Sequence, residues 1–476
     1  MSGQLEMNLE GGNHFSEALR SGRFSIVLEC AGGTTDGESS TDAARGRVEA
    51  LARKAGDLPE IAGISVMDRL PVEDIDDPTP LAALYSKHSG KPVVLHLSGK
   101  GSDPERIRTL LTRSKSLGIQ NILAVTGDRS VHHPNAGVLR QFPAYENGYL
   151  DSARILKTTK NAASDAFAGA VVNPHKYQPS DLYVQYFKAV RKLACGAEYL
   201  VAQAGWDIRK LQELQWFLQM RELDVPVLAR LLLLNGGAVR ELPDSLPPGV
   251  AISRSLAALF QREFSVNETQ SLAAQIQRIA LLAAGCRLLG YNGVQIGGIH
   301  DPQTLEMVVR QIRAALEKHT DYCRWLNAWT EHHAGIDFSP VPRPFYYFRA
   351  AEDPIAMYDP AECSVSESEF PRPRLRERLR SRTLSLLLND LLAKAIRNRV
   401  SRILCRSCRS YADILNECEY LCISQCPKRL VYGPCGSGRP DGTCEFGKGP
   451  CFFHRVLSLA NARGHLDRLE TEIEHD

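Results

Sequence analysis

Short apolar and β-branched runs alternate with longer amphipathic segments along the first 330 residues of this chain. The runs predict eight strands, at 24–29, 63–67, 92–96, 121–125, 167–172, 199–203, 227–233 and 294–296. The segments between them, such as 103–117 and 182–193, have apolar residues at helical spacing and are long enough for crossover helices. Eight strand–helix units in this length predict a (β/α)8 TIM barrel, a fold of the α/β class.

A doubly wound sheet is the alternative architecture for such an alternation. In that fold a glycine-rich turn opens the helix after the first strand. The corresponding residues here are Cys30-Ala31-Gly32-Gly33, which lack the third glycine and the start of a helix. The barrel is therefore the better prediction.

Polar residues stand where most of the predicted strands end. A barrel carries its chemistry at the C-terminal ends of its strands, so we expect these side chains to converge on one rim. Convergence favours a ligand site over a set of unrelated strand-end hydrogen bonds. The positions are Glu29, His96, Thr126-Gly127-Asp128, Asn173-Pro174-His175, Gln203 and His300-Asp301.

Eight of the thirteen cysteines are concentrated near the C-terminus. Reduced thiols at this density are stabilised by sharing a soft metal, which predicts a metal-binding module with two four-ligand sites. The spacing C-x2-C suits zinc, and a cysteine followed by proline is frequent at 4Fe-4S iron–sulfur clusters. Which cysteines share a site is left open by the spacing. The predicted ligands are Cys405, Cys408, Cys418, Cys422, Cys426, Cys435, Cys444 and Cys451.

Three of these cysteines, Cys418, Cys422 and Cys426, are four residues apart. In a helix this spacing places all three thiols on one face. The proline at position 427 would end that helix. The spacing therefore predicts a short helix that presents metal ligands.

The region between the barrel and the cysteines differs in composition from both. Residues 337–374 are rich in proline and acidic residues, which predicts an extended linker. Arginine then stands at every second position from Arg372 to Arg382, and 384–404 predicts an amphipathic helix that docks the tail. We interpret the arginine run as a solvated face. The predicted domains are an N-terminal extension (1–22), the barrel (23–336), the linker (337–383) and a cysteine-rich domain (384–476).

The charge of the chain is nearly balanced, at +2. This balance gives no general attraction to nucleic acid or to a membrane surface. No apolar run approaches the roughly 20 residues that cross a bilayer, and residues 1–12 are polar and acidic, unlike a signal peptide. We expect a cytoplasmic protein that binds no nucleic acid and does not insert into membranes.

Over residues 24–312 the chain resembles methylenetetrahydrofolate reductase, a family of flavin-dependent barrels. The similar stretches are Phe-Ser-Ile-Val-Leu-Glu at 24–29, Val-Leu-His-Leu at 94–97, the segment 118–128 that ends in Thr-Gly-Asp, and 195–203. The tail, with Gly-Pro-Cys-Gly at 433–436 and Cys-Pro-Lys at 426–428, resembles the cysteine-rich partner subunit found with the reductases of acetogenic bacteria. Here that partner is expected to be fused to the barrel.

The resemblance implies a reaction and roles for individual residues. Reduced flavin would convert 5,10-methylenetetrahydrofolate to 5-methyltetrahydrofolate. Glu29 is implied as the catalytic acid, which requires a raised pKa. Asp128 is implied beside the flavin and the folate, where its charge lowers the flavin potential. Gln203 is implied as the amide that binds the pterin.

The resemblance also implies which residues bind the flavin. Two positions depart from the family: Thr126 replaces the arginine of most members, and Met67 replaces a threonine common near the flavin. Without the guanidinium, we expect weaker binding of the flavin phosphate at this position, so FMN is an alternative to the expected FAD. The implied flavin contacts are His96, Thr126, Gly127, Asp128, His175 and Lys192.

We therefore expect a methylenetetrahydrofolate reductase whose electrons come through the cysteine-rich module from a redox protein, or from NAD(P)H, in an oligomeric assembly. One alternative is a barrel methyltransferase that uses tail zinc to activate the methyl acceptor, and it would need no flavin. Another is a nucleic-acid-binding protein built on the arginine run and zinc ribbons.

Overall fold

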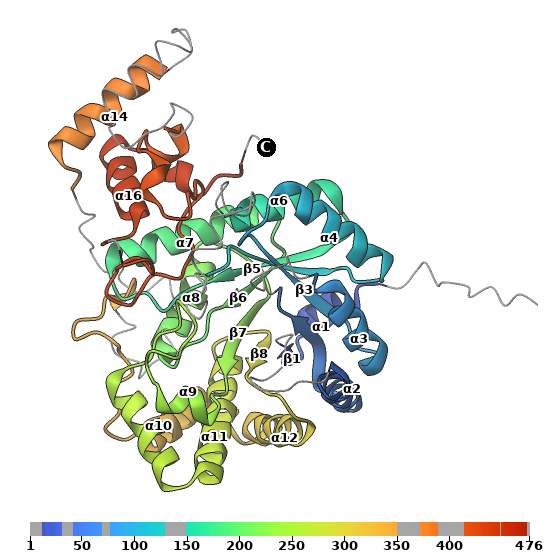
Figure 1. The fold of residues 1–476 in the computed structure, drawn as a ribbon. Coiled ribbons are helices and arrows are strands. Elements are labelled where there is room, and N and C mark those ends of the chain that lie inside the picture. Colours follow the sequence, from blue (N-terminus) through green and yellow to red (C-terminus); the bar gives the residue numbers. More distant parts are fainter. Residues whose placement is uncertain are drawn as a thin grey trace, which may run out of the picture.

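The computed structural model describes residues 12–30, 41–68, 77–128, 149–349, 372–388, 414–447 and 449–473. Eight parallel strands form one closed barrel in the order β1 to β8, and β8 closes it by pairing with β1 (Figure 1). The predicted TIM barrel is therefore confirmed. The strands are β1 (Ser25–Cys30), β2 (Ile61–Val66), β3 (Val93–Ser98), β4 (Asn121–Val125), β5 (Phe167–Val172), β6 (Tyr199–Ala202), β7 (Val227–Leu232) and β8 (Gly293–Gly297).

Helices cover the outside of the barrel. Many begin at an aspartate whose side chain accepts a backbone N–H of the first turn, as at Asp103, Asp151, Asp207 and Asp301. The barrel helices are α1 (His14–Arg20), α2 (Thr41–Asp57), α3 (Thr79–Ser89), α4 (Pro104–Ser116), α6 (Ser152–Ala162), α7 (Pro179–Ala194), α8 (Ile208–Met220), α9 (Gly236–Arg240), α10 (Arg254–Val266), α11 (Glu268–Leu288), α12 (Pro302–Lys318) and α13 (Tyr322–His332).

Aromatic side chains fill the N-terminal end of the barrel interior. Phe15 of α1 is fully buried, and its ring packs edge-on against Phe167 and Tyr199, with ring centroids 6.1 and 5.7 Å away. The Tyr199 hydroxyl donates to the carbonyl of Ile122 across the barrel, at 2.8 Å. These aromatic side chains close the N-terminal end of the barrel, so the opposite end, where the strands finish, is the one available for a ligand.

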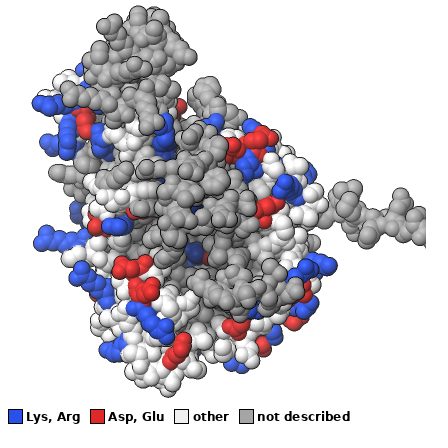
Figure 2. Space-filling view, in the orientation of Figure 1, with Lys and Arg blue, Asp and Glu red and all other residues white. Residues whose placement is uncertain are grey.

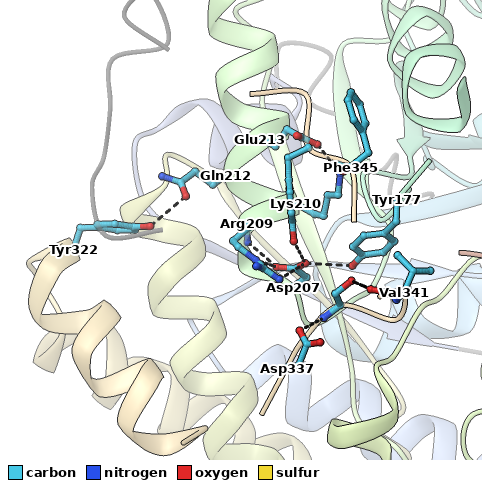
Figure 3. A network of polar contacts seen from close by, with 12 residues as sticks. Tyr177, Asp207, Arg209, Lys210, Gln212, Glu213, Tyr322, Asp337, Val341 and Phe345 are labelled. Atoms are coloured by element: carbon cyan, nitrogen blue, oxygen red, sulfur yellow. Dashed lines mark hydrogen bonds and ion pairs between the residues drawn. The ribbon is translucent and has the colours of Figure 1, made fainter. Parts of the chain in front are cut away.

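A buried polar network attaches part of the predicted linker to α8. The Lys210 ammonium donates to Glu213 Oε1 at 3.0 Å and to the carbonyl of Phe345 at 2.6 Å, inside the protein (Figure 3). The Tyr346 hydroxyl donates to Asp207 at 2.9 Å. These residues after the barrel are therefore packed into the core rather than extended in solvent.

The described C-terminal elements are α14 (Leu375–Leu388), the 3-10 turns η4 (Asn416–Cys418), η5 (Ile423–Gln425) and η6 (Leu466–Leu469), and α16 (Phe452–Arg463). Apolar residues of α16 pack against α7, beside the barrel (Figure 1). The predicted helix through Cys418, Cys422 and Cys426 is wrong. Glu419 and Tyr420 have positive φ values of 51° and 59°, a conformation that interrupts a helix. Most of the helix predicted at 384–404 lies outside the described residues.

Neither sign of charge dominates the described residues on the face shown in Figure 2. In Figure 2, lysine and arginine are interspersed with aspartate and glutamate around the visible face. Within the described ranges, no helix is both long and apolar enough to span a bilayer.

Candidate functional site

A cavity of about 540 Å³ opens at the C-terminal ends of the barrel strands. Its size falls in the usual range for small-molecule sites. The predicted site residues that line it are Glu29, His96, Thr126, Gly127, Asp128, Asn173, Lys192 and Gln203. The strand ends thus converge as expected, while the roles of these residues stay predictions.

Arg230 of β7 forms the centre of the cavity's polar network. Its guanidinium donates two hydrogen bonds to Glu29, each 2.6 Å long, and a third to Gln203 Oε1 at 2.9 Å. Gln295 of β8 donates a further bond to Glu29 at 2.6 Å. Gly297 leaves room for this carboxylate, since a Cβ there would lie 2.7 Å from Glu29 Oε1. Glu29 is therefore held in one orientation.

The pairing with Arg230 corrects the ionisation state predicted for Glu29. Burial by itself would raise the pKa of this carboxyl, as the role of acid requires. The charge and hydrogen bonds of Arg230 outweigh burial, and the pKa of Glu29 is lowered to about 2. Glu29 is shielded from water as expected, but it is a carboxylate rather than an acid in this arrangement.

His96 lies next to Glu29 and is neutral. Its Nε2 is 2.5 Å from the hydroxyl oxygen of Ser65. Burial lowers the pKa of His96 to about 4, although the charge of Glu29 acts in the opposite direction. His96 can therefore offer a hydrogen bond to a ligand at neutral pH but not a positive charge.

The segment 126–128 follows β4 along the cavity wall. Gly127 has φ 81°, and a Cβ there would lie 2.6 Å from the Lys100 side chain, so glycine is needed. Asp128 is half exposed, with Lys100 Nζ 3.6 Å from its carboxylate. The Thr126 hydroxyl lies 3.1 Å from the hydroxyl of Ser152 and donates to it.

Lys192 lines the cavity, whereas His175 does not. Lys192 is buried, donates to the carbonyl of Val171 at 2.5 Å, and has a pKa lowered to about 7 by burial and by Lys188. His175 does not line the cavity: its ring is buried against Gly205, where a Cβ would lie 2.4 Å from Nε2. Burial lowers its pKa to about 4. A direct flavin contact from His175 is therefore not supported.

At the rim, one further expectation differs and two lining residues were not predicted. Asp301 caps α12, accepting from the backbone N–H of Thr304 at 2.8 Å, and does not line the cavity. Arg230 and Gln295 line it and were not singled out from the sequence. The available signal was a charged or amide residue inside an otherwise apolar strand, which a barrel can direct only inward or toward the helices.

The C-terminal domain supplies part of the cavity wall. Residues 435–437 line the cavity with the barrel residues. Asn173 donates to the carbonyl of Gly436 at 2.8 Å, and Lys176 donates to that of Gly438 at 2.6 Å. In the reverse direction, Lys428 donates to the carbonyl of Gly127 at 2.7 Å. Residues 435–437 and the barrel therefore line the same cavity.

Lys188 is a further buried anchor between the barrel and the C-terminal domain. Its ammonium contacts Asp151 and the carbonyls of Gly433 and Pro434, at 3.0 to 3.1 Å, with a side chain only 2 % exposed. Since hydrogen bonds of a charged group contribute about 1.5–3 kcal/mol, Lys188→Met should accelerate amide exchange at 433–438 by roughly tenfold or more. Hydrogen exchange with mass spectrometry measures this.

The control is Lys160→Met, because Lys160 is an exposed lysine on the neighbouring helix α6. It should leave exchange at 433–438 unchanged. Equal protection of this loop in Lys188→Met and in the unmodified protein would contradict the anchoring role.

The predicted metal ligands are placed in part. Cys405 and Cys408 lie outside the described residues. Cys422 is paired in a disulfide, which differs from the reduced thiolate predicted for it. The other predicted ligands are free thiols, and Cys435 lines the cavity. Across the described ranges, no three His, Cys, Asp or Glu side chains form a group that could hold a metal ion.

Solved structures that are similar to part of this chain include the following three. An uncharacterized protein from Clostridium thermocellum that binds two copies of 5-methyl-5,6,7,8-tetrahydrofolic acid is 15% identical, with a TM-score of 0.44, over 63% of this chain and 98% of that one. Phosphonopyruvate hydrolase, in complex with oxalate and Mg²⁺, is 12% identical with a TM-score of 0.34, over 64% and 86%. Thiamine phosphate pyrophosphorylase from Pyrococcus furiosus is 9% identical with a TM-score of 0.31, over 64% and 99%. At these scores the likeness carries no conclusion about activity.

No curated protein matches the chain at a significant level. Two family models do match it: methylenetetrahydrofolate reductase over residues 51–277, and "Methylene-tetrahydrofolate reductase C terminal" over residues 389–476. The first match spans most of the barrel, from α2 into α11. The chain therefore contains a methylenetetrahydrofolate reductase family domain and, C-terminal to it, a second domain related to that family.

Proposed function

We propose that this protein reduces 5,10-methylenetetrahydrofolate to 5-methyltetrahydrofolate, with a bound flavin as the hydride donor. The observation that carries the proposal is the convergence of Glu29, Asp128 and Gln203 on one cavity of a barrel with a matching family domain. When bound, a reduced flavin supplies hydride to the one-carbon unit. The residues of the chain must hold both ring systems and deliver one proton.

Two residues on the cavity wall are suited to a pterin ring. The Gln203 amide can donate and accept hydrogen bonds at once. The Glu29 carboxylate can accept two parallel N–H groups. Both line the cavity and are hydrogen-bonded to Arg230. A folate that enters this site therefore meets groups that are already engaged.

The polar side chains that line the cavity are suited to binding a flavin. Lys100 and Lys192 line it, and Lys192 is buried, which suits contact with a phosphate or a ring oxygen. Thr126 carries no charge, and its hydroxyl is bound to Ser152. The phosphate contact of the family's arginine thus has no counterpart at position 126, so FAD is proposed with FMN as the alternative.

A metal module in the C-terminal domain that receives electrons from a redox protein stays a prediction. The origin of this domain as a partner subunit is also a prediction. The support for the metal module is the cysteine spacing together with the position of Cys435 at the cavity. Because the described residues contain no formed metal site, we derive no electron-transfer step. NAD(P)H is the alternative donor.

Anaerobic purification tests the proposal directly. Flavin absorbance, and methyltetrahydrofolate formed from methylenetetrahydrofolate with reduced viologen or NADH, would support it. A protein that lacks flavin but transfers methyl groups would favour the methyltransferase alternative. Iron, zinc and sulfide assays test the metal module. Deleting the tail is a poor test, because deletion would expose the apolar face of α7 and leave Lys188 without its carbonyl partners.

Asp128→Asn should raise the reduction potential of the bound flavin. A carboxylate near the ring disfavours the anionic reduced form, so its removal favours reduction. A redox titration against dyes of known potential measures the shift. Asp165→Asn is the matched control, because Asp165 is a surface aspartate just before β5, at the other end of the barrel. An unchanged or lower potential in Asp128→Asn would contradict the placement of Asp128 beside the flavin.

A further inference from the structure

Helix α14 of the C-terminal domain exposes three leucines on one face. Leu375, Leu379 and Leu386 are 71%, 58% and 68% exposed. Since an α-helix turns by about 100° per residue, the three side chains point within about 40° of one another. Among the described residues six large apolar side chains are exposed, and these three share one helix. Single exposed leucines are ordinary, but a contiguous apolar strip indicates an interaction surface.

The opposite face of α14 is already packed. Glu377 pairs with Arg455 of α16 at 2.6 Å, and Ser381 Oγ donates to the carbonyl of Glu419 at 2.8 Å. Ser381 and Leu384 are buried, and together with Glu377 they have the i, i+4, i+7 spacing of one helix face. The leucine face is therefore not the side by which α14 attaches to its own domain. Figure 1 shows α14 beyond α16, on the side away from the barrel.

The leucine face has the spacing of a coiled-coil seam. Leu379 follows Leu375 by four residues, and Leu386 follows Leu379 by seven. With Arg382 between the last two, these positions correspond to d, a, d and a of a heptad repeat. A helix that lies on a membrane surface presents a much broader apolar face, at least about 100° wide. The occupant with the matching geometry is therefore one facing helix.

Arginines around the leucines determine the charge that this facing helix must carry. Residues 372–388 contain six arginines and one acidic residue, Glu377, which is paired on the inner face. Arg376 and Arg378 are exposed at the flanking e and g positions, and exposed Arg382 lies in the seam. A second copy of this chain would place arginine against arginine, which is repulsive. Glutamates beside the seam of the facing helix would instead form ion pairs with these arginines.

We propose that the leucine face of α14 docks an acidic amphipathic helix of another protein, with leucines in its seam and glutamates beside them. The helix α14 is attached to α16, and α16 packs against α7 of the barrel. The same C-terminal domain lines the barrel cavity through residues 435–437. The partner therefore docks on the domain that supplies part of the cavity wall. This docking does not rest on the proposed folate function.

A synthetic peptide of three heptads is the probe. It has leucine at a and d, except for one central glutamate that faces Arg382, and glutamate at e and g. Repulsion between the glutamates keeps the peptide from pairing with itself at pH 7. Fluorescence anisotropy of the labelled peptide, titrated with the full-length protein, should show saturable binding that weakens as salt is added. The same peptide with lysine in place of every glutamate should bind roughly tenfold more weakly or less. Equal binding of the two peptides would overturn the proposal.

Removing the leucines tests whether the peptide binds at this face. Leu379→Ser/Leu386→Ser should weaken binding of the acidic peptide by roughly tenfold or more, because both leucines become buried in the complex. Both side chains are exposed in the protein, so the variant should fold normally. Val266→Ser is the matched control, since Val266 is 75% exposed on the barrel helix α10, and it should leave binding unchanged. Unchanged binding in the leucine variant would refute docking at α14.

Charge reversal tests the chemistry of the partner. Arg376→Glu/Arg378→Glu/Arg382→Glu should lose the acidic peptide and bind the lysine peptide, and the same preference as in the unmodified protein would contradict the proposal. Sedimentation velocity and vesicles of phosphatidylcholine with phosphatidylserine test the other occupants. A dimer that the leucine variant dissociates, or vesicle binding in place of peptide binding, would assign the face to a second copy or to a membrane and overturn the proposal. Absence of peptide binding because another segment of the chain covers the face would overturn it as well.

Discussion

Replacing Glu29 with glutamine should lower the rate of folate reduction by roughly 10² to 10⁴ while the flavin stays bound and reducible. General acid catalysis is typically worth this much. Glu29 is ionised in its pair with Arg230, so the acid role requires its carboxyl to gain a proton during the reaction, and glutamine keeps the shape of the side chain but cannot do so. Stopped-flow measurement of flavin reoxidation by methylenetetrahydrofolate would give the rate, with flavin content measured on the same sample. A variant within about threefold of the unmodified enzyme would exclude Glu29 as the acid.

The substitution also removes the anion beside Arg230, and this effect must be separated from lost acid chemistry. The matched control is Glu263→Gln, which deprives buried Arg278 of its carboxylate outside the cavity. Glu263→Gln should keep folate reduction near that of the unmodified enzyme. Urea unfolding of both variants reports any loss of stability. A loss of activity shared by both variants would show that the rate is sensitive to buried ion pairs in general.

Lys210→Met should lower the free energy of unfolding by about 3–5 kcal/mol, the usual cost of removing one partner of a buried ion pair. Lys210 and Glu213 are both 0% exposed in their side chains, and their charged atoms lie 3.0 Å apart. The variant also leaves the carbonyl of Phe345 without the ammonium that it accepts from at 2.6 Å. Urea denaturation, followed by circular dichroism, measures the change.

Lys115→Met is the control for this prediction. Lys115 pairs with Asp165 on the surface, where the two side chains are 62% and 47% exposed. Pairs of this kind contribute about 0–1 kcal/mol. The double variant Lys210→Met/Glu213→Leu should recover part of the lost stability, because it leaves no buried charge unpaired. Equal effects of Lys210→Met and Lys115→Met would show that the buried network is not important for stability.

The barrel was predictable because its signal is local. Strands at 121–125 and 167–172 appear in the structure with the predicted bounds. Each is an apolar run between polar segments, and a parallel strand buried on both faces requires such a run. The tail was harder to predict, because its cysteines repeat at helical spacing while Glu419 and Tyr420 adopt left-handed backbone angles. A spacing rule assumes regular dihedrals and fails where turns replace them.

The sequence by itself determined which side chains stand at the strand ends, and therefore that Glu29, His96, Asp128 and Gln203 would share a cavity. Only the tertiary structure decided their chemical state. Arg230 is 201 residues away from Glu29 along the chain, and the closed barrel brings the two together with oxygens and nitrogens 2.6 Å apart. A carboxyl's pKa depends on charges within a few ångströms in space, whatever their separation in sequence. Closure of the barrel thus made the expected acid a carboxylate.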